Sequence, residues 1–452
     1  MRVLLVSANR ERKPSPVMPL GVLWVAAAVR RAQHEVRVLD LCFVLDPHAA
    51  LSETIRAFPP DVVGIGLRNL CGNTYADDDT LVDYYQALAR SIRAATSAPL
   101  VLGGSAFSLR PRQLLERLGA DHGVVGEGEQ TFLDLLTVLA AGDHPPLLSY
   151  APAVAQHLPP SARRSGLDGL PFPARDLVDP RYFTDGDGTI NVQTKRGCAF
   201  ACAYCDYPDL EGRMLRLRDP EVVADEAIAC ASIVGATHLF LVDSVFNNPR
   251  HHALAVCRAI ERRGGGLPWI CYASPAVVDR ELCEAMARAG CVGVELGSDS
   301  GTDETLARLH KPFRRDDIVS AHRYFAEAGI RDCHTFVVGA FNETPAEVAQ
   351  TIEFVDELDP DVAVFIVFRE DRETRGVGGA RDRTAILELL AREAPRRPGW
   401  VVPELDIRFG DRVEALLARR SVRGPSWLHL ASLRRRTTRA RGRAGKVCGA
   451  NT

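Results

Sequence analysis

The sequence predicts an α/β protein with a doubly wound, Rossmann-like N-terminal domain, then a partial (β/α)6 barrel of the TIM type and a short C-terminal segment. Three observations support this fold class. Short apolar runs alternate with amphipathic stretches, which is typical of parallel βαβ units. A proline-rich interval divides this alternation into two series. The length of 452 residues is enough for two or three domains, each with its own core.

The first series spans residues 1–141 and contains five predicted strands, most of them followed by a helical pattern. The strands are Val3–Ser7, Val36–Asp40, Val62–Leu67, Leu100–Gly103 and Gly123–Gly126. Ligands of an open parallel sheet bind in the crevice at the C-terminal ends of the strands. No Gly-x-Gly-x-x-Gly follows the first strand, so a nicotinamide or flavin dinucleotide lacks its usual fingerprint.

The second series spans residues 188–370 and contains six predicted strands. They are Thr189–Gln193, His238–Val242, Trp269–Ala273, Val292–Leu296, Thr335–Val338 and Val362–Ile366. Between them lie helical runs with apolar residues at three- and four-residue spacing, such as Pro220–Val234, Arg280–Ala289 and Pro345–Glu357. Six βα units predict a partial or full barrel, in which ligands gather at the C-terminal strand ends.

Two segments fall outside this alternation. Residues 142–187 carry eight prolines without sustained periodicity, so we expect a linker between the domains. Residues 371–452 end in a basic run, because no acidic residue occurs from Ala415 onward while nine arginines and one lysine accumulate. We expect a solvated or disordered tail there. Contact of this tail with an anionic substrate, a carrier protein or RNA is the alternative.

Composition excludes several classes of protein. Lys and Arg number 55 against 58 Asp and Glu, and this near-neutral balance gives no reason to expect nucleic acid as the main partner. With 46% hydrophobic and 25% charged residues, disorder, collagen-like repeats and a coiled-coil rod are disfavoured. No apolar run approaches the roughly 20 residues of a membrane span, and the chain opens on a strand rather than a signal sequence. We therefore expect a cytoplasmic protein without a membrane partner.

Three of the 12 cysteines lie within eight residues, on the loop after the first strand of the second series. These are Cys198, Cys202 and Cys205, and thiolates at this spacing can converge on one soft metal centre. A structural zinc site or an ordinary ferredoxin cluster would need a fourth ligand, whereas the next cysteine, Cys230, falls in a helical pattern. A zinc site and chance clustering remain the alternatives. The other nine cysteines are expected to be small buried apolar residues.

The motif Cys-x3-Cys-x2-Cys, with Tyr204 just before its last cysteine, resembles the radical S-adenosylmethionine (SAM) superfamily. The resemblance implies that Cys198, Cys202 and Cys205 hold a [4Fe–4S] cluster whose fourth iron chelates SAM. It also implies an external electron donor such as flavodoxin or ferredoxin. Tyr204 would lie near the adenine, with simple core packing as its alternative role.

Three further strand ends resemble SAM-contacting positions of this superfamily. Asp243 and Ser244, after the second strand, stand where the family places groups on the SAM amino group, although the usual Gly-Gly-Glu is absent. Asp299 and Ser300 stand in the fourth-strand stretch commonly written Gly-x-Glu-Ser, which meets the ribose or carboxylate. Glu343 lies in a turn that resembles Gly-x-Pro-Gly-Glu-Thr, with Pro and Gly replaced, and a purely structural role is the alternative.

The first domain resembles the cobalamin-binding subclass of radical SAM proteins. The residues that carry this resemblance follow its strands: Pro19-Leu-Gly21, Arg68-Asn69, Gly103-Gly104-Ser105 and Gly126-Glu127-Gly128-Glu129. No Asp-x-His-x-x-Gly follows the first strand, so no histidine is predicted to ligate cobalt from below. Arg68 is the candidate near that lower face, and a surface or phosphate-contacting role for it stays open.

Both cofactors together imply a methyltransferase that acts on an unactivated carbon. In this family's chemistry one SAM methylates cobalamin, and a second yields a 5′-deoxyadenosyl radical that removes hydrogen from the substrate. The predicted function is C-methylation of a secondary-metabolite intermediate that is a free small molecule or carrier-bound. A radical cyclase or rearrangement enzyme is the main alternative, and a cobalamin-binding regulator without catalysis is a third. Neither the substrate nor any catalytic residue can be read from the sequence.

Overall fold

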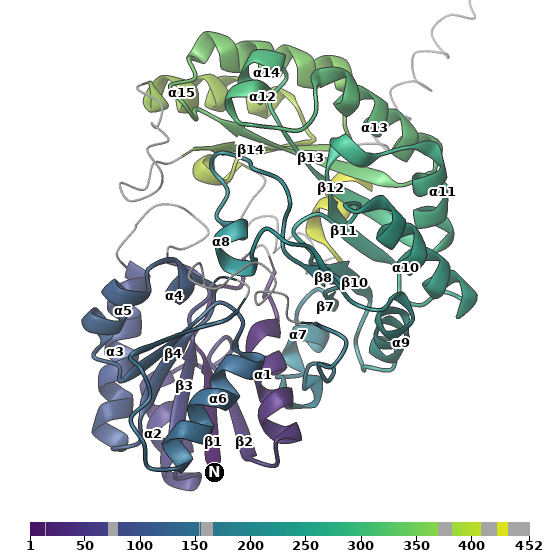
Figure 1. Cartoon of the computed structure of the whole chain (residues 1–452). Coiled ribbons are helices and arrows are strands. Elements are labelled where there is room, and N and C mark those ends of the chain that lie inside the picture. Colours follow the sequence, from purple (N-terminus) through teal and green to yellow (C-terminus); the bar gives the residue numbers. More distant parts are fainter. Residues whose placement is uncertain are drawn as a thin grey trace, which may run out of the picture. The chain divides into compact units, whose positions relative to one another are not determined.

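The computed structural model describes residues 1–13, 15–70, 80–152, 154, 166–368, 382–407 and 423–432. The chain divides into two compact units (Figure 1). The first unit comprises Met1–Tyr182, Lys195–Ala199 and Asp206–Asp219. The second unit comprises Phe183–Thr194, Phe200–Cys205 and Pro220–Thr452. The two units confirm the predicted α/β class, with a doubly wound sheet in one and a partial barrel in the other.

A six-stranded parallel sheet of the order β2-β1-β3-β4-β5-β6 forms the centre of the first unit. Its strands are β1 (Arg2–Ser7), β2 (Glu35–Asp40), β3 (Val62–Gly66), β4 (Leu100–Gly103), β5 (His122–Val125) and β6 (Leu148–Tyr150). The first five confirm the predicted strands to within two residues. Strand β1 is buried almost throughout, since helices cover both faces of the sheet. The strand order reverses between β1 and β3, which places the ligand crevice of such a fold at their C-terminal ends.

Helices pack on both faces of this sheet (Figure 1). They are α1 (Leu20–Arg31), α2 (Pro47–Ala57), α3 (Thr80–Ala95), α4 (Ser105–Leu109), α5 (Pro111–Leu118) and α6 (Gly128–Ala140). Buried residues of α1 and α6 form one core with β1, and those of α2, α3 and α5 form the other. Asp46 begins α2 by accepting hydrogen bonds from two backbone N–H groups, which satisfies donors that the first helical turn leaves open.

Part of the predicted linker, residues 142–187, forms regular structure and packs on the first unit. Residues Leu148–Tyr150 form β6 and extend the first sheet by pairing with β5. Ala174 is buried in the core under α1 and α6, and the 3-10 turn Arg175–Leu177 and helix α7 (Arg181–Thr184) follow. A strand of three residues flanked by prolines gives no alternation long enough to read from the sequence. The predicted domain boundaries stay a prediction.

The second unit is built on a seven-stranded parallel sheet of the order β15-β14-β13-β12-β11-β10-β7. Its strands are β7 (Thr189–Val192), β10 (His238–Leu241), β11 (Trp269–Ala273), β12 (Cys291–Asp299), β13 (Arg331–Val338), β14 (Val362–Val367) and β15 (Trp400–Val401). Six of them confirm the predicted series, and β15 adds one from the C-terminal segment. Over the described residues the sheet stays open between β7 and β15, so the barrel is partial.

Helices connect successive barrel strands and cover the outer face of the sheet (Figure 1). They are α9 (Pro220–Cys230), α10 (Arg250–Arg262), α11 (Arg280–Arg288), α12 (Asp303–Arg308), α13 (Arg315–Glu327), α14 (Pro345–Leu358) and α15 (Arg383–Glu393). Helix α14 begins with a capping box, in which the Thr344 hydroxyl accepts from Glu347 N–H and the Glu347 carboxylate accepts from Thr344 N–H. This helix packs its buried face on β13 and β14. No helix among the described residues is long and apolar enough to cross a membrane.

The expectation of a solvated basic tail is wrong for residues 423–432. Residues 426–432 are helical, and Trp427, Leu428 and Ala431 are buried against inner-face residues of the barrel sheet. The Arg423 guanidinium donates to the Gly235 carbonyl oxygen at 2.6 Å. Arginines outnumber the apolar residues in this part of the sequence. Composition alone therefore does not reveal the packed helix. The rest of the basic run lies outside the described residues.

Candidate active site

The segment from Gly197 to Cys205, which carries the three cysteines, is called the cysteine loop. Its first part belongs to the first unit and is shaped by close backbone contacts. Gly197 has a φ of +91°, and an added Cβ would lie 2.2 Å from the Met214 carbonyl oxygen, so no larger residue fits. The next residue, Cys198, donates its backbone N–H to the Gly212 carbonyl oxygen at 3.1 Å. The hairpin of β8 (Lys195–Arg196) and β9 (Arg216–Leu217) joins this stretch to the end of the loop. The position of Cys198 is therefore set by its backbone before any ligand binds.

The cysteines differ in accessibility in the way that a ligand role requires. All described cysteines are free thiols. Cys202 and Cys205, in the second unit, are partly exposed, and Cys198 is 8% exposed. The other described cysteines are buried, as predicted for small apolar residues; Cys71 and Cys448 lie outside the described residues. Cysteine thiolates are the donors that hold an iron–sulfur cluster, and none of these three cysteines is used in a disulfide.

A buried triad of polar side chains lies beside the later part of this loop, within the second unit. The Tyr204 hydroxyl donates to Asp299 Oδ2 at 2.9 Å. Lys311 forms an ion pair with Asp299 and donates to the Tyr204 oxygen at 3.0 Å. The backbone N–H of Ala203 also donates to the Leu309 carbonyl oxygen at 3.1 Å. The loop residues next to Cys202 and Cys205 are thus fastened to the segment that follows β12.

Burial and charge determine the state of this triad. Burial, together with the nearby thiols of Cys202 and Cys205, raises the pKa of Tyr204 far above its usual range, so its hydroxyl stays protonated. Asp299 is 1% exposed and has a φ of +59°, at a point where the register between β12 and β13 shifts. Its carboxylate would be an uncompensated buried charge without Lys311. The triad brings together two predicted site residues, Tyr204 and Asp299, and adds Lys311, which the sequence did not single out.

The carboxylate of Asp243, another predicted site residue, is hydrogen-bonded within the barrel unit. It is 0% exposed, and its two carboxylate oxygens accept from the backbone N–H of Thr194 at 2.7 Å and from the Thr194 hydroxyl at 2.5 Å. Thr194 directly precedes the β8 strand that leads into the cysteine loop. Asp243 therefore fixes the chain just before the loop, and this contact is a structural use of its charge. Ser244 follows it and is partly exposed.

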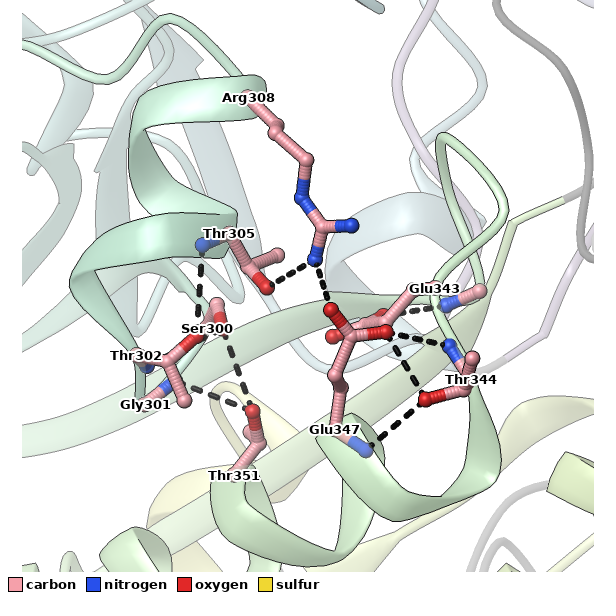
Figure 2. A network of polar contacts seen from close by, with 10 residues as sticks. Ser300, Gly301, Thr302, Thr305, Arg308, Glu343, Thr344, Glu347 and Thr351 are labelled. Atoms are coloured by element: carbon pink, nitrogen blue, oxygen red, sulfur yellow. Dashed lines mark hydrogen bonds and ion pairs between the residues drawn. The ribbon is translucent and has the colours of Figure 1, made fainter.

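Ser300 is likewise bound to a neighbouring helix (Figure 2). Its hydroxyl lies 3.2 Å from the Thr351 hydroxyl of α14, and Thr351 also accepts from the Gly301 backbone N–H at 3.1 Å. Ser300 is 0% exposed. A Cβ at Gly301 would lie 2.5 Å from Phe354, which shows how closely the strand end meets α14. The Ser300 hydroxyl thus joins the end of β12 to α14.

Glu343 retains one carboxylate oxygen without a partner among the described residues. Its other oxygen accepts from the Gly339 backbone N–H at 2.6 Å, which closes the turn after β13. Burial raises the pKa of Glu343 to about 7, although this hydrogen bond opposes the shift. Figure 2 shows the neighbouring contact in which Arg308 of α12 reaches Glu347 of α14 at 2.6 Å. Glu343 thus combines a structural contact with one carboxylate oxygen that has no partner among the described residues.

The predicted cobalamin contacts occupy three neighbouring loops at the C-terminal edge of the first sheet. Arg68 and Asn69 follow β3, Gly103-Gly104-Ser105 joins β4 to α4, and Gly126-Glu127 joins β5 to α6. The Ser105 hydroxyl donates to the Arg68 carbonyl oxygen at 2.7 Å, which ties two of these loops together. Gly104 has a φ of +95°, and a Cβ there would lie 2.4 Å from the Leu67 carbonyl oxygen. The Arg68 side chain is exposed at this edge.

These loops carry small residues, which allow a large ligand to approach the backbone closely. Small residues follow adjacent strands, and an added Cβ at Gly21, after β1, would meet no atom within 4 Å. Among the described histidines of this unit, His34 directly precedes β2, His48 lies in the first turn of α2, His122 begins β5 and His144 follows α6.

Glu127 is held by a buried ion network within the first unit. Its carboxylate pairs with Arg216 and with Arg196 at 3.1 Å, while Arg196 also binds Glu129 at 2.6 Å. Burial opposes ionisation of Glu127, but the hydrogen bonds and charges of the two arginines outweigh it and lower its pKa. Arg196 stands over the ring of Trp24 at 5.6 Å. The carboxylate of Glu127 is therefore occupied by arginines that flank the cysteine loop. Only the backbone of Glu127 is left to contact a ligand.

A separate polar cluster lies between β13 and α13. Asp332 Oδ2 lies 2.5 Å from His322 Nδ1 and 3.2 Å from His334 Nε2, and His334 Nδ1 lies 2.8 Å from the Ser298 hydroxyl. Burial opposes ionisation of Asp332, but the hydrogen bonds to both histidines hold its pKa well below the usual range. The polar atoms of these side chains are hydrogen-bonded to one another. The cluster is therefore explained as a structural network between neighbouring elements of the barrel.

Comparisons with known proteins agree with this geometry. A model of the radical SAM superfamily matches residues 192–355, and a model of the B12 binding domain matches residues 9–136. An uncharacterized methyltransferase of Pyrococcus horikoshii is 26% identical over 378 residues, which cover 81% of this chain and 80% of that protein. The tryptophan 2-C-methyltransferase of Streptomyces laurentii is 30% identical over 374 residues, 67% of this chain and 60% of that enzyme.

A solved structure is also similar. It is the radical S-adenosylmethionine methyltransferase TsrM from Kitasatospora setae, with cobalamin and a [4Fe–4S] cluster bound. The TM-score is 0.70 at 27% identity, and the match covers 80% of this chain and 71% of TsrM. A second structure of TsrM, at 28% identity, holds tryptophan and a SAM analogue. The chain thus carries a radical SAM domain and a B12-binding domain, and it is similar to relatives named as methyltransferases and to the structures of TsrM.

Proposed function

We propose that this chain transfers a methyl group to an unactivated carbon of a small secondary-metabolite intermediate. The observation that carries the proposal is the union, in one chain, of a Cys-x3-Cys-x2-Cys loop on a radical SAM barrel with a B12-binding domain. Methyl groups ordinarily move as CH3+ to nucleophiles, so a chain that carries both domains is suited to a carbon that is not nucleophilic. The relatives named as methyltransferases support transfer over rearrangement.

The thiols of Cys198, Cys202 and Cys205, none of which is in a disulfide, are the proposed cluster ligands. When bound, the cluster supplies the electron that cleaves SAM, and cobalamin supplies the methyl carrier. The chain's own residues hold these groups in place and exclude water. Tyr204, Asp299 and Lys311 fasten the loop beside two of the ligands. Glu343, with its free oxygen, is the proposed polar contact for SAM in the turn after β13.

For SAM, the backbone at Ser244 and at Asp299 supports contact better than the carboxylate of Asp243 or the hydroxyl of Ser300, because these side chains are already engaged. For cobalamin, we propose the loops that contain Arg68-Asn69, Gly103-Gly104-Ser105 and Gly126-Glu127. The exposed guanidinium of Arg68 is the candidate for the lower face of the corrin. The proposed partners are a free or carrier-bound small molecule and a flavodoxin or ferredoxin as electron donor.

Isotopic labelling tests the methyl transfer directly. The reconstituted enzyme is incubated anaerobically with methyl-labelled SAM, an electron donor and an extract that contains candidate substrates, with tryptophan as one defined candidate because a similar structure holds it. We expect a product that gains one labelled methyl group on carbon. An unlabelled product together with stoichiometric 5′-deoxyadenosine would refute methylation and favour the cyclase or rearrangement alternative.

The cluster assignment has its own test with a matched control. Cys202→Ala removes a proposed ligand, whereas Cys283→Ala removes a thiol that is 0% exposed in α11. We expect iron and sulfide content, and SAM cleavage, to fall only in Cys202→Ala. SAM cleavage by Cys202→Ala at the wild-type rate would contradict the assignment.

A further inference from the structure

The inner face of the barrel sheet is accessible toward the C-terminal ends of its strands. Side chains alternate between this face and the outer face that the helices cover. The inner-face residues at this level are partly or well exposed: Phe240, Tyr272, Glu295, Thr335 and Val364. On the outer face, Phe336 and Phe365 are 0% exposed in the core that the helices complete. The accessible residues therefore line the interior of the partial barrel.

Residues 426–432 close the bottom of this interior. Trp427 and Leu428 belong to one buried cluster with Ile270, Cys333 and Val362. Cys333 is the register partner of Glu295, so this cluster shares the sheet face of Glu295. Gly293 of β12 is the register partner of Ile270, and an added Cβ there would lie 2.6 Å from the Trp427 ring. The indole of Trp427 thus closes the barrel interior next to Gly293, on the N-terminal side of Glu295 along β12; this closed end is called the floor.

Glu295 is the acidic residue of β12 that lies directly above this floor. Trp427 Nε1 donates to its Oε1 at 2.9 Å, and this is the one hydrogen bond that the described residues give the Glu295 carboxylate. Two residues further along the strand, an added Cβ at Gly297 would meet no atom within 4 Å, so the space above Glu295 is open. Burial raises the pKa of Glu295 to about 7, which reflects the lack of a basic side chain beside it.

Tyr272 is the neighbour of Glu295 on the adjacent strand. The two residues are register partners of the parallel pair β11 and β12 and share the inner face. The Tyr272 ring is 37% exposed and packs on Phe240, with ring centroids 4.8 Å apart. An aromatic face next to a carboxylate is an arrangement that attracts ammonium groups, through cation–π attraction and a charge-assisted hydrogen bond.

We propose that Glu295 and Tyr272 form a subsite for a protonated amine of the substrate, at the bottom of the barrel interior. The inference rests on the proposed methyltransferase function and narrows its substrate class to amine-bearing compounds. The ammonium donates to the free oxygen of Glu295 and faces the Tyr272 ring. It supplies the positive charge that no lysine or arginine among the described residues brings to Glu295.

Binding of two probes with the same ring and opposite charge tests this subsite. Tryptamine carries an ammonium group, and indole-3-propionate carries a carboxylate. Equilibrium dialysis against the reconstituted holoenzyme at pH 8 should show tighter binding of tryptamine. Glu295→Gln should weaken tryptamine binding by roughly 10- to 100-fold, the range for loss of a charged hydrogen bond, and should not weaken binding of indole-3-propionate. Glu284→Gln, an exposed change on α11, is the matched control and should bind both probes as wild type does.

Equal tryptamine affinity in wild type and Glu295→Gln, or preference of the wild type for indole-3-propionate, would overturn the subsite. If Glu295→Gln does not fold, Tyr272→Leu decides, because it removes the exposed ring while keeping an apolar residue; unchanged tryptamine binding there overturns the proposal. The dialysis needs no turnover. Charge-dependent binding without labelled product would therefore count against methyl transfer alone, and labelled product from a substrate without an amine would count against the subsite alone.

Discussion

Replacement of Lys311 by methionine should destabilise the barrel unit strongly, because it leaves a buried carboxylate without its countercharge. The side chain of Asp299 is 2% exposed and that of Lys311 is 7% exposed, so solvent screens neither. Removal of one partner from a buried ion pair costs about 3–5 kcal/mol. The Tyr204 hydroxyl still donates to Asp299, which places the expected loss nearer about 3 kcal/mol.

The double variant Asp299→Asn with Lys311→Met separates a charge effect from lost packing. Replacement of both partners of a buried pair by neutral groups is often close to neutral, so we expect a loss of about 1 kcal/mol. Urea unfolding followed by circular dichroism measures each variant. With a slope of about 3 kcal/mol/M, a loss of about 3 kcal/mol lowers the midpoint by about 1 M. Losses below about 1 kcal/mol in both single variants, or a double variant equal to their sum, would refute the reasoning.

Three further predictions concern other parts of the site. Gly197→Ala should lower the iron content of the reconstituted protein, because a backbone oxygen lies 2.2 Å from the new Cβ. Gly264→Ala, with a φ of +82° but open space around it, should retain wild-type iron. Glu129→Gln removes one of the two carboxylates that pair with Arg196, so it should lower the free energy of unfolding in urea by about 3 kcal/mol. An unchanged free energy of unfolding would show that the network is dispensable. Glu343 has a pKa of about 7 when folded and about 4.3 when unfolded, so its contribution to stability falls as pH rises between these values. The free energy of unfolding of Glu343→Gln, relative to that of the wild type, should therefore rise by up to about 3 kcal/mol between pH 5 and pH 8. A difference between the two proteins that does not change with pH would contradict the burial argument.

Local patterns were enough to predict the strands and the cysteine loop. Runs such as that of β1 are apolar on both faces because helices cover both sides of the sheet, and this leaves a clear signal in the sequence. The loop cysteines are recognisable because their spacing is short. The proximity of Tyr204 to Asp299 also follows from topology, since the C-terminal ends of parallel strands meet at one edge.

The pairing of charges could not be predicted in the same way. Glu127 was expected at a cofactor, yet its carboxylate binds Arg196 and Arg216, which lie more than 60 residues away along the chain. Lys311 lies in no motif that the sequence reading used, and its importance comes from the position of Asp299 in three dimensions. Ion pairs between distant residues carry no periodicity, so only the folded arrangement identifies them.

The cysteine motif therefore specifies the donors, and residues outside it specify where the donors lie. Its two ends are fixed by separate means: Arg196 is held by Glu127 and Glu129 in the first unit, and Tyr204 is held by Lys311 and Asp299 in the second. A loop fixed in this way loses little conformational entropy when a cluster binds. The same charges would be costly to bury without their partners. We expect the ion pairs around the loop to position the proposed cluster ligands, so their loss should lower the iron content as well as the stability.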